Sequence, residues 1–337
     1  MKKQLTLLAA CVLAGVAGAY ATCWRINPSP FAKAQFKTVA EAMADINVVS
    51  GDTLLLDPGS YGDFNVTSRD NITIIGTGYF LDKNKQWAES QAANVGTVTL
   101  GTGSKIEGCI ANAIKLQGEG TVSRCKIGYT TVSGKNNLIE RCYIESGITL
   151  NANSIARNNI IFDHATGDKG CIFENNTIVS PGSYGALVLS FIDSTIRNNV
   201  IISTRTGFDG NQVPYSCYIY ENVKNCVIQN NVFSVPERYI DSNDMFKGYP
   251  NNYYLGATVE NTFVNEGSDD AKWQLLSTSA AKGAATHGGD CGAFGGPTPY
   301  VLSGIPMFLP HITEALVPAK PTNGKITVKL KIENQNE

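Results

Sequence analysis

Residues 156–161 read Ala-Arg-Asn-Asn-Ile-Ile, and residues 173–178 repeat the pattern as Phe-Glu-Asn-Asn-Thr-Ile. Each segment of this kind places an apolar residue three positions before, and another two positions after, a central Asn, Cys or Thr. Self-similarity at a regular interval predicts a stack of similar structural units. Further segments stand at 139–144, 196–201, 228–233 and 259–264.

The central positions of these segments form one column along the chain, with spacings of 16, 17, 17, 17, 23, 32 and 31 residues. A period near 17 is too short for helical repeats, which need about 33 residues or more. The alternating apolar positions favour strands instead. We therefore expect coils of short strands stacked about 4.8 Å apart, with buried Asn side chains hydrogen-bonding along the stack. The column contains Cys109, Cys125, Cys142, Asn159, Asn176, Asn199, Asn231 and Thr262.

Upstream of the repeats, residues 36–44 read as a short amphipathic helix, followed by "GDTLLLDPGSY" at 51–61 and "NITIIG" at 71–76. With the repeats, this order resembles the right-handed parallel β-helix of the pectate-lyase-like superfamily over roughly residues 36–265. The resemblance implies an all-β solenoid whose N-terminal helix caps the open end of the core. It implies no particular activity, because that superfamily holds lyases, hydrolases, epimerases, adhesins and phage proteins.

The tail carries a second resemblance. "GAFGGPTPYVLSGIP" at 292–306 is similar to the C-terminal segment of many exported β-helix proteins of Bacteroidetes-type bacteria, and implies a short terminal extension. Residues 325–332 alternate Lys with apolar residues and predict one exposed strand.

The N-terminus predicts export. Lys2 and Lys3 precede an apolar run, and residues 19–21 form an A-x-A cleavage signal. A rival interpretation places a lipid on Cys11 after the lipobox-like residues 8–10. We expect a signal peptide at 1–21, an N-terminal segment with the capping helix at 22–50, the β-helix at 51–270 and a C-terminal cap or extension at 271–337.

Composition limits the classes of partner. The 337 residues carry a net charge of −2, which argues against a nucleic-acid partner. Only 17% of residues are charged, below the usual quarter or so, so Asn, Thr, Ser and Gly must cover much of the surface. After residue 21 no stretch reaches about 18 apolar residues, so we expect no transmembrane helix in the mature chain.

The cysteines are expected to be mainly structural. Cys109, Cys125 and Cys142 fall in the ladder column, where they act as small buried hydrophobes. Zinc is not expected, because no CxxC accompanies them. The pair most favourable for a disulfide is Cys217 and Cys226, nine residues apart in an insertion.

The longer spacings mark loops that leave the coils at 181–189, 204–220 and 235–256. Loops of adjacent coils tend to emerge on one side, so the latter two are expected to line a groove. Aromatic faces with acids and arginines suit a sugar, although the tyrosines could equally pack the loops onto the coils. Weak catalytic candidates are Arg205, Asp209, Arg238, Asp241 and Asp244, and weak substrate-binding candidates are Tyr215, Tyr218, Tyr239, Tyr249, Tyr253 and Tyr254.

Three functions remain open. The favoured one is an exported surface or carbohydrate-binding protein without catalysis. The alternative is a polysaccharide lyase or glycoside hydrolase in the groove, for which a carboxylate pair or an Arg base would be needed. The third is a cell-envelope component whose final strand pairs with a neighbour.

No cofactor or metal site is identified in the sequence, and calcium is expected only if the protein is a lyase. Asp269-Asp270 and His287-Gly288 match parts of a polygalacturonase-like pattern, but they stand out of order and read as accidental. A polysaccharide or a cell-envelope component is the expected partner.

Overall fold

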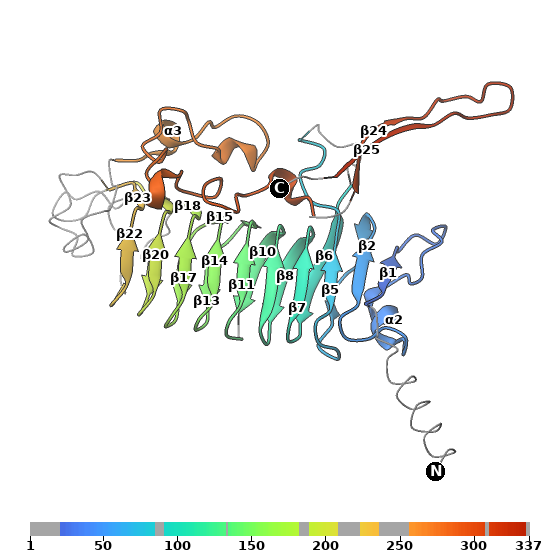
Figure 1. Ribbon diagram of the computed structural model, residues 1–337, viewed down its shortest axis with the longest axis horizontal. Helices are drawn as coiled ribbons and strands as arrows, with labels where there is room; N and C mark the ends of the chain where they lie inside the picture. Colours follow the sequence, from blue (N-terminus) through green and yellow to red (C-terminus); the bar gives the residue numbers. More distant parts are fainter. Residues whose placement is uncertain are drawn as a thin grey trace, which may run out of the picture.

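The computed structural model describes residues 21–84, 91–132, 134–181, 189–207, 223–235, 256–306 and 310–334. Figure 1 shows one elongated stack of coils, with later segments lying along its flank. All pairing within the stack is parallel, and each coil passes through two sheets, as in a right-handed parallel β-helix. The fold class expected from the repeats is therefore confirmed.

The first sheet has ten strands and receives one from each coil. Neighbouring strands stand in register, as where Ala156 of one coil lies beside Phe173 of the next. Its strands, in spatial order, are β1 (Cys23–Ile26), β2 (Thr53–Leu56), β5 (Thr73–Ile75), β7 (Ser104–Glu107), β9 (Gly120–Ser123), β11 (Leu138–Glu140), β14 (Ile155–Arg157), β17 (Ile172–Glu174), β20 (Thr195–Arg197) and β22 (Val227–Gln229).

The second sheet wraps the other two faces of the coils. Long strands cover both faces in the early coils, namely β6 (Ala93–Leu100), β8 (Ile110–Leu116) and β10 (Lys126–Val132), and β6 also pairs with β3 (Gly59–Ser60) and β4 (Phe64–Asn65). In later coils the ladder divides. One branch contains β12 (Tyr143–Ile144), β15 (Ile160–Phe162), β18 (Thr177–Ser180), β21 (Val200–Ser203) and β23 (Val232–Phe233); the other contains β13 (Ile148–Leu150), β16 (Ala165–Gly167) and β19 (Leu189–Phe191).

The Asn-Asn pairs build the turn between the two sheets. The second Asn of each pair points inward and is fully buried at Asn159, Asn176, Asn199 and Asn231. The residue before it has positive φ, a conformation that Asn and Gly adopt at least cost. That turn column consists of Gly108, Arg124, Arg141, Asn158, Asn175, Asn198 and Asn230.

The expected capping helix is present as α2 (Val39–Ala44). Thr38 and Glu41 form a capping box, in which each side chain accepts a hydrogen bond from the other's backbone N–H. Val39 and Ala42 are buried in the main apolar cluster. Figure 1 places α2 at the N-terminal end of the stack, so it covers the first coil.

The prediction of a last repeat at residues 259–264 is wrong. Residues Val259–Thr262 form one helical turn, α3, with Thr258 as its N-cap and Asn261 completing a capping box. The T-x-x-N spacing gives the backbone a local alternative to the strand. Thr262 therefore does not extend the asparagine column, and the described coils end at β23.

The three ladder cysteines lie in the core as expected, each fully buried and free. The Cys217–Cys226 disulfide is not formed, because Cys226 is a free buried thiol whose Sγ hydrogen-bonds to the Phe191 and Lys224 carbonyls. It stands in the coil after Ser194, whose hydroxyl accepts the backbone N–H of Cys171. Cys171, Ser194 and Cys226 thus form a second inward-facing column, at the turn that precedes the strands of the first sheet. Cys217 lies outside the described residues.

After α3 the chain turns back and runs along the stack, from its C-terminal coils toward its N-terminal ones (Figure 1). We call residues 281–306 the strap. It binds the turn column one coil at a time: Asn230 donates to the Ala284 carbonyl (2.9 Å), Asn158 to that of Gly295 (2.7 Å) and Arg124 to that of Ile305 (2.7 Å). Three short 3-10 turns accompany this part of the chain: η4 (Ala271–Trp273), η5 (Thr286–Gly288) and η6 (Leu302–Gly304).

Beyond the strap, β24 (Pro310–Leu316) and β25 (Lys329–Asn334) form an antiparallel hairpin, which confirms a strand in the Lys-alternating tail. Figure 1 shows the hairpin extending away from the coils. In the part of the chain that the structure describes, no helix has the length and apolar character needed to cross a membrane. The expected signal peptide at 1–21 and the lipobox alternative at Cys11 fall almost wholly outside that part.

Candidate binding site

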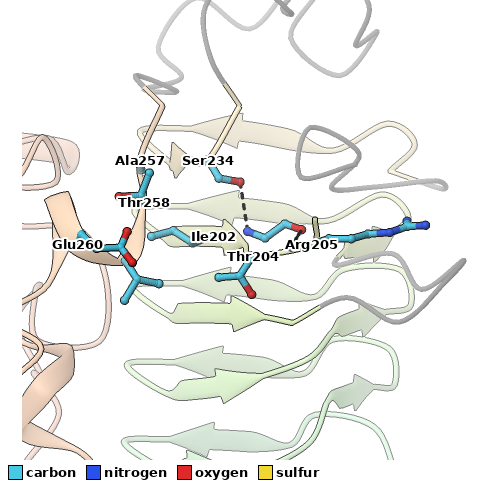
Figure 2. A pocket seen from close by; sticks show the side chains of 9 residues that line it. Ile202, Thr204, Arg205, Ser234, Ala257, Thr258 and Glu260 are labelled. Atoms are coloured by element: carbon cyan, nitrogen blue, oxygen red, sulfur yellow. Dashed lines mark hydrogen bonds between the residues drawn. The ribbon is translucent and has the colours of Figure 1, made fainter. Parts of the chain in front are cut away.

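A pocket of about 270 Å³ lies where the two longest insertions leave the coils. Strand β21 ends at Ser203, which lines the pocket. The second insertion begins after Val235 and ends before Gly256, and the residues flanking it, Ser234 and Ala257, line the same pocket. The bases of both insertions therefore meet at one place. The pocket is lined by Ile202, Ser203, Thr204, Arg205, Ser234, Ala257, Thr258, Val259 and Glu260 (Figure 2).

A column of serines anchors this part of the coils. Ser180 pairs in register with Ser203, and Ser234 stands on the following coil. The Ser234 hydroxyl accepts the backbone N–H of Ser203 at 3.1 Å, as drawn in Figure 2. All three serines are nearly buried. Their backbone is held by the parallel ladder, so the serines form a rigid base for the two residues that follow Ser203.

Thr204 and Arg205 are those two residues. Thr204 bonds back to the Ser180 carbonyl through its backbone N–H at 2.8 Å and through its hydroxyl at 3.2 Å. The Arg205 backbone N–H reaches the Ser203 hydroxyl at 3.5 Å. The backbone is thus fixed up to Arg205, whose half-buried side chain extends away from Glu260 in Figure 2.

The opposite wall is the start of α3. Its first turn carries Glu260, whose pKa is lowered by its own backbone N–H and by the Thr258 hydroxyl. Glu260 therefore carries a full negative charge at neutral pH and is poorly suited to act as a general acid. The pocket places this anion on one side, the Arg205 cation on the other and hydroxyl groups between them.

Only one of the predicted catalytic candidates, Arg205, falls among the described residues, and it lines the pocket. Sequence reasoning missed the serine column, although a Ser follows each apolar strand end at residues 180, 203 and 234. It also missed Glu260, which the repeat assignment had placed on a strand. The remaining candidates lie outside the described residues: Asp209, Arg238, Asp241, Asp244, Tyr215, Tyr218, Tyr239, Tyr249, Tyr253 and Tyr254.

A second pocket, of about 240 Å³, lies between the strap and the carboxyl ends of strands β14, β17 and β20 of the first sheet. The last residues of successive strands alternate in charge there. Arg157 pairs with Glu140 and Arg197 with Glu174, each at 2.7 Å. His287 of the strap lines the same pocket in a left-handed backbone conformation. The two arginines are thus already neutralised by glutamates of the preceding coils.

The two fragments of a polygalacturonase-like pattern, Asp269-Asp270 and His287-Gly288, do not come together in one pocket. Asp270 is fully buried beneath the strap, where its carboxylate accepts the Ser303 backbone N–H at 2.7 Å and the Ser268 hydroxyl at 2.6 Å. It is not among the residues that line the pocket at His287. Asp270 therefore has a structural role, joining the strap to the segment before it.

The chemistry available at the first pocket is hydrogen bonding and charge recognition. Among the described residues, Glu260 is the carboxylate in its lining, whereas glycoside hydrolysis uses two. No cluster of three or more His, Cys, Asp or Glu side chains that could hold a metal ion occurs in the described ranges. A scan against protein-family models and searches of curated proteins and of solved structures each returned no match.

Proposed function

We propose that the protein is an exported β-helix that binds a polysaccharide on its flank, with the pocket at Arg205 as one sugar-binding subsite. The observation that carries the proposal is the meeting of two insertion bases at one pocket whose described polar groups are hydroxyls, one cation and one anion. Sugar-binding sites use a small number of polar groups held on a rigid framework.

The charges suggest which glycan to test first. Arg205 can hold a carboxylate or sulfate through paired N–H donors, and Glu260 can accept hydrogen bonds from sugar hydroxyls. A uronate-containing chain fits this arrangement, with its acid at Arg205 and its neutral edge toward Glu260. The fixed backbone at Thr204 supports such binding, because little ordering would be needed when the glycan arrives.

The experiment measures binding and turnover on the same samples. Purified protein is titrated calorimetrically with polygalacturonate, alginate and neutral glucans, and each mixture is assayed for unsaturated products and new reducing ends. We expect binding of an acidic glycan without turnover, weakened roughly tenfold or more by Arg205→Ala. The matched control is Arg25→Ala, which removes an exposed arginine paired with Asp57 at the opposite end of the stack.

Two results would contradict the proposal. Failure to bind any acidic glycan would remove Arg205 as a glycan anchor. Turnover that is lost in Arg205→Ala would replace the binding function with the alternative, a polysaccharide lyase or hydrolase. Addition and chelation of calcium during the assay would show whether such a lyase needs the metal.

Export is part of the proposal and has its own test. Cleavage after Ala21 gives a protein that begins at Thr22, whereas lipidation at Cys11 gives a heavier, membrane-associated species. The N-terminal sequence and intact mass of protein recovered from cell fractions distinguish the two. Recovery of the uncleaved chain in the cytoplasm would contradict both.

A further inference from the structure

The hairpin carries a large share of the exposed apolar surface. Fourteen large hydrophobic side chains are exposed in the described part of the chain, and seven of them lie between residues 312 and 332. Such a concentration on a monomer's surface marks an interaction site. The seven are Ile312, Leu316, Val317, Ile326, Val328, Leu330 and Ile332.

The pairing register gives the hairpin two unlike faces. Ile312 lies opposite Ile332, and Ala315 opposite Leu330, so one face is apolar. The other face is mixed. Glu314 lies opposite Lys331 there, and Leu316 lies opposite Lys329. Ile312, Leu330 and Ile332 keep 40%, 51% and 57% of their surface exposed. A two-stranded ribbon with no third strand and an uncovered apolar face is marginal in water, so it gains stability from a partner.

The two edges of the hairpin differ. Strand β24 begins at Pro310 and its register shifts between Ile312 and Glu314, and both features hinder pairing with another strand. Strand β25 contains neither a proline nor a register shift. Within the described residues its outer edge has no neighbouring strand. The β25 edge is therefore the one suited to accept a strand.

We propose that β25 pairs in antiparallel fashion with β25 of a second copy of this chain, with Ile332 on the twofold axis. In this register Lys331 of each copy lies opposite Glu333 of the other, which gives two cross-strand ion pairs. The in-chain contact between Lys331 and Glu333 places both side chains on one face. The result is a four-stranded sheet with one continuous apolar face, and the interface is isologous.

Neighbouring registers are disfavoured by charge. Centring the axis on Leu330 places Lys329 opposite Lys331 in both directions, and centring it on Lys331 places that lysine opposite its own copy. Like charges directly opposite one another destabilise a strand pair. The Ile332-centred register avoids both repulsions and places the Ile332 side chains of the two copies side by side at the axis. Charge complementarity therefore selects a second copy of the chain as the occupant.

Sedimentation velocity over roughly a hundredfold range of protein concentration tests the proposal. We expect a monomer–dimer equilibrium in the wild-type protein. Lys331→Glu and Glu333→Lys should each weaken dimerisation by roughly tenfold or more, because each creates like-charge pairs across the axis. Mixing the two variants should restore dimers as heterodimers, and the double variant should again form homodimers.

Mixing the two charge-reversal variants distinguishes loss of strand pairing from misfolding of the hairpin. If each substitution misfolded the hairpin, the mixture of the two variants would not form dimers. Lys320→Glu is the matched control, a charge reversal on the same extension outside β25. A wild-type protein that stays monomeric throughout, or a dimer that responds alike to all four variants, overturns the proposal. The glycan test at Arg205 is independent of this outcome.

Discussion

The side-chain amide of Asn159 donates to Oδ1 of Asn176, 2.9 Å away on the next coil. The same oxygen accepts the Asn159 backbone N–H at 3.0 Å, and the Asn176 amide donates to the Ala156 carbonyl at 2.9 Å. Asn176 in turn gives its backbone N–H to Oδ1 of Asn199 at 2.8 Å. Each buried amide thus satisfies backbone groups that the turn would otherwise leave without a partner.

Asn176→Ala should lower the free energy of unfolding by about 3 kcal/mol, because it deprives the buried backbone N–H and side-chain amide of Asn159 of their shared acceptor. Denaturant unfolding followed by circular dichroism measures the loss. Asn94→Ala is the matched control: Asn94 is exposed, and its amide makes one local bond to the Ala92 carbonyl. Equal stability of the two variants would contradict a structural role for the ladder.

The sequence predicted this ladder because its chemistry repeats. In every Asn-Asn pair the first residue suits a positive φ and the second supplies a buried amide. Because the pairs recur at a regular spacing, both features can be recognised from the sequence. The strap could not be predicted in the same way, since each of its contacts occurs once. Nothing in the sequence around Gly295 or Ile305 indicates that its carbonyl receives a side chain from the turn column.

Gly304→Ala should detach the C-terminal part of the strap, which packs on the early coils. A Cβ at this position would lie 2.1 Å from the Tyr79 ring and 2.5 Å from the Arg124 carbonyl oxygen, and its φ is +53°. Gly288→Ala is the matched control, because Gly288 also has positive φ, +78°, with nothing within 4 Å of the added Cβ. We expect a cost of about 1 kcal/mol for Gly288→Ala from the backbone alone and at least twice that for Gly304→Ala.

Limited proteolysis gives a local readout for the same pair. Cleavage within 290–306 should accelerate in Gly304→Ala and stay near wild type in Gly288→Ala, because only the former displaces the strap from Tyr79. Unchanged protection in both would mean that the strap contact at Gly304 adapts without opening.

Asp270→Ala should be far more damaging than Asp269→Ala, although the residues are adjacent. Asp270 is fully buried and accepts hydrogen bonds from Ser268, Ser303 and Asn84. Asp269 keeps 58% of its side chain exposed and contacts Lys272 at 3.5 Å. Breaking the buried network costs about 3 kcal/mol, whereas an exposed ion pair contributes under about 1 kcal/mol. Thermal unfolding of both variants checks the difference, and similar melting temperatures would contradict it.

The candidate site was less predictable than the fold for a related reason. The two insertions were visible as breaks in the 17-residue spacing, and Arg205, one of several candidates named in the first of them, lines the pocket at its base. Glu260 was not, because 259–264 imitates a repeat while Thr258 and Asn261 cap a helical turn instead. The capping residues thus favour a helical turn over another strand at this point. The ladder position of this segment is Thr262, so no Asn is present there to continue the ladder.

The buried thiols make a prediction about alkaline pH. Burial raises the pKa of Cys125 and of Cys291 from 9.0 to about 12 in the folded protein. Below pH 9 both thiols are neutral in the folded and unfolded chains, so their burial costs nothing extra. Between pH 9 and 12 the unfolded thiols ionise and the folded ones do not, which favours the unfolded chain. The free energy of unfolding should therefore decline with rising pH across this window.

Each such thiol should steepen the decline by about 1.4 kcal/mol per pH unit once it is ionised in the unfolded chain. The Cys125→Ala/Cys291→Ala double variant should unfold with a shallower pH dependence than the wild type above pH 9 and a parallel one below it. Tyrosines and the other cysteines ionise alike in both proteins, so the difference in slope isolates these two thiols. Parallel curves up to pH 11 would contradict burial of the two thiols in neutral form.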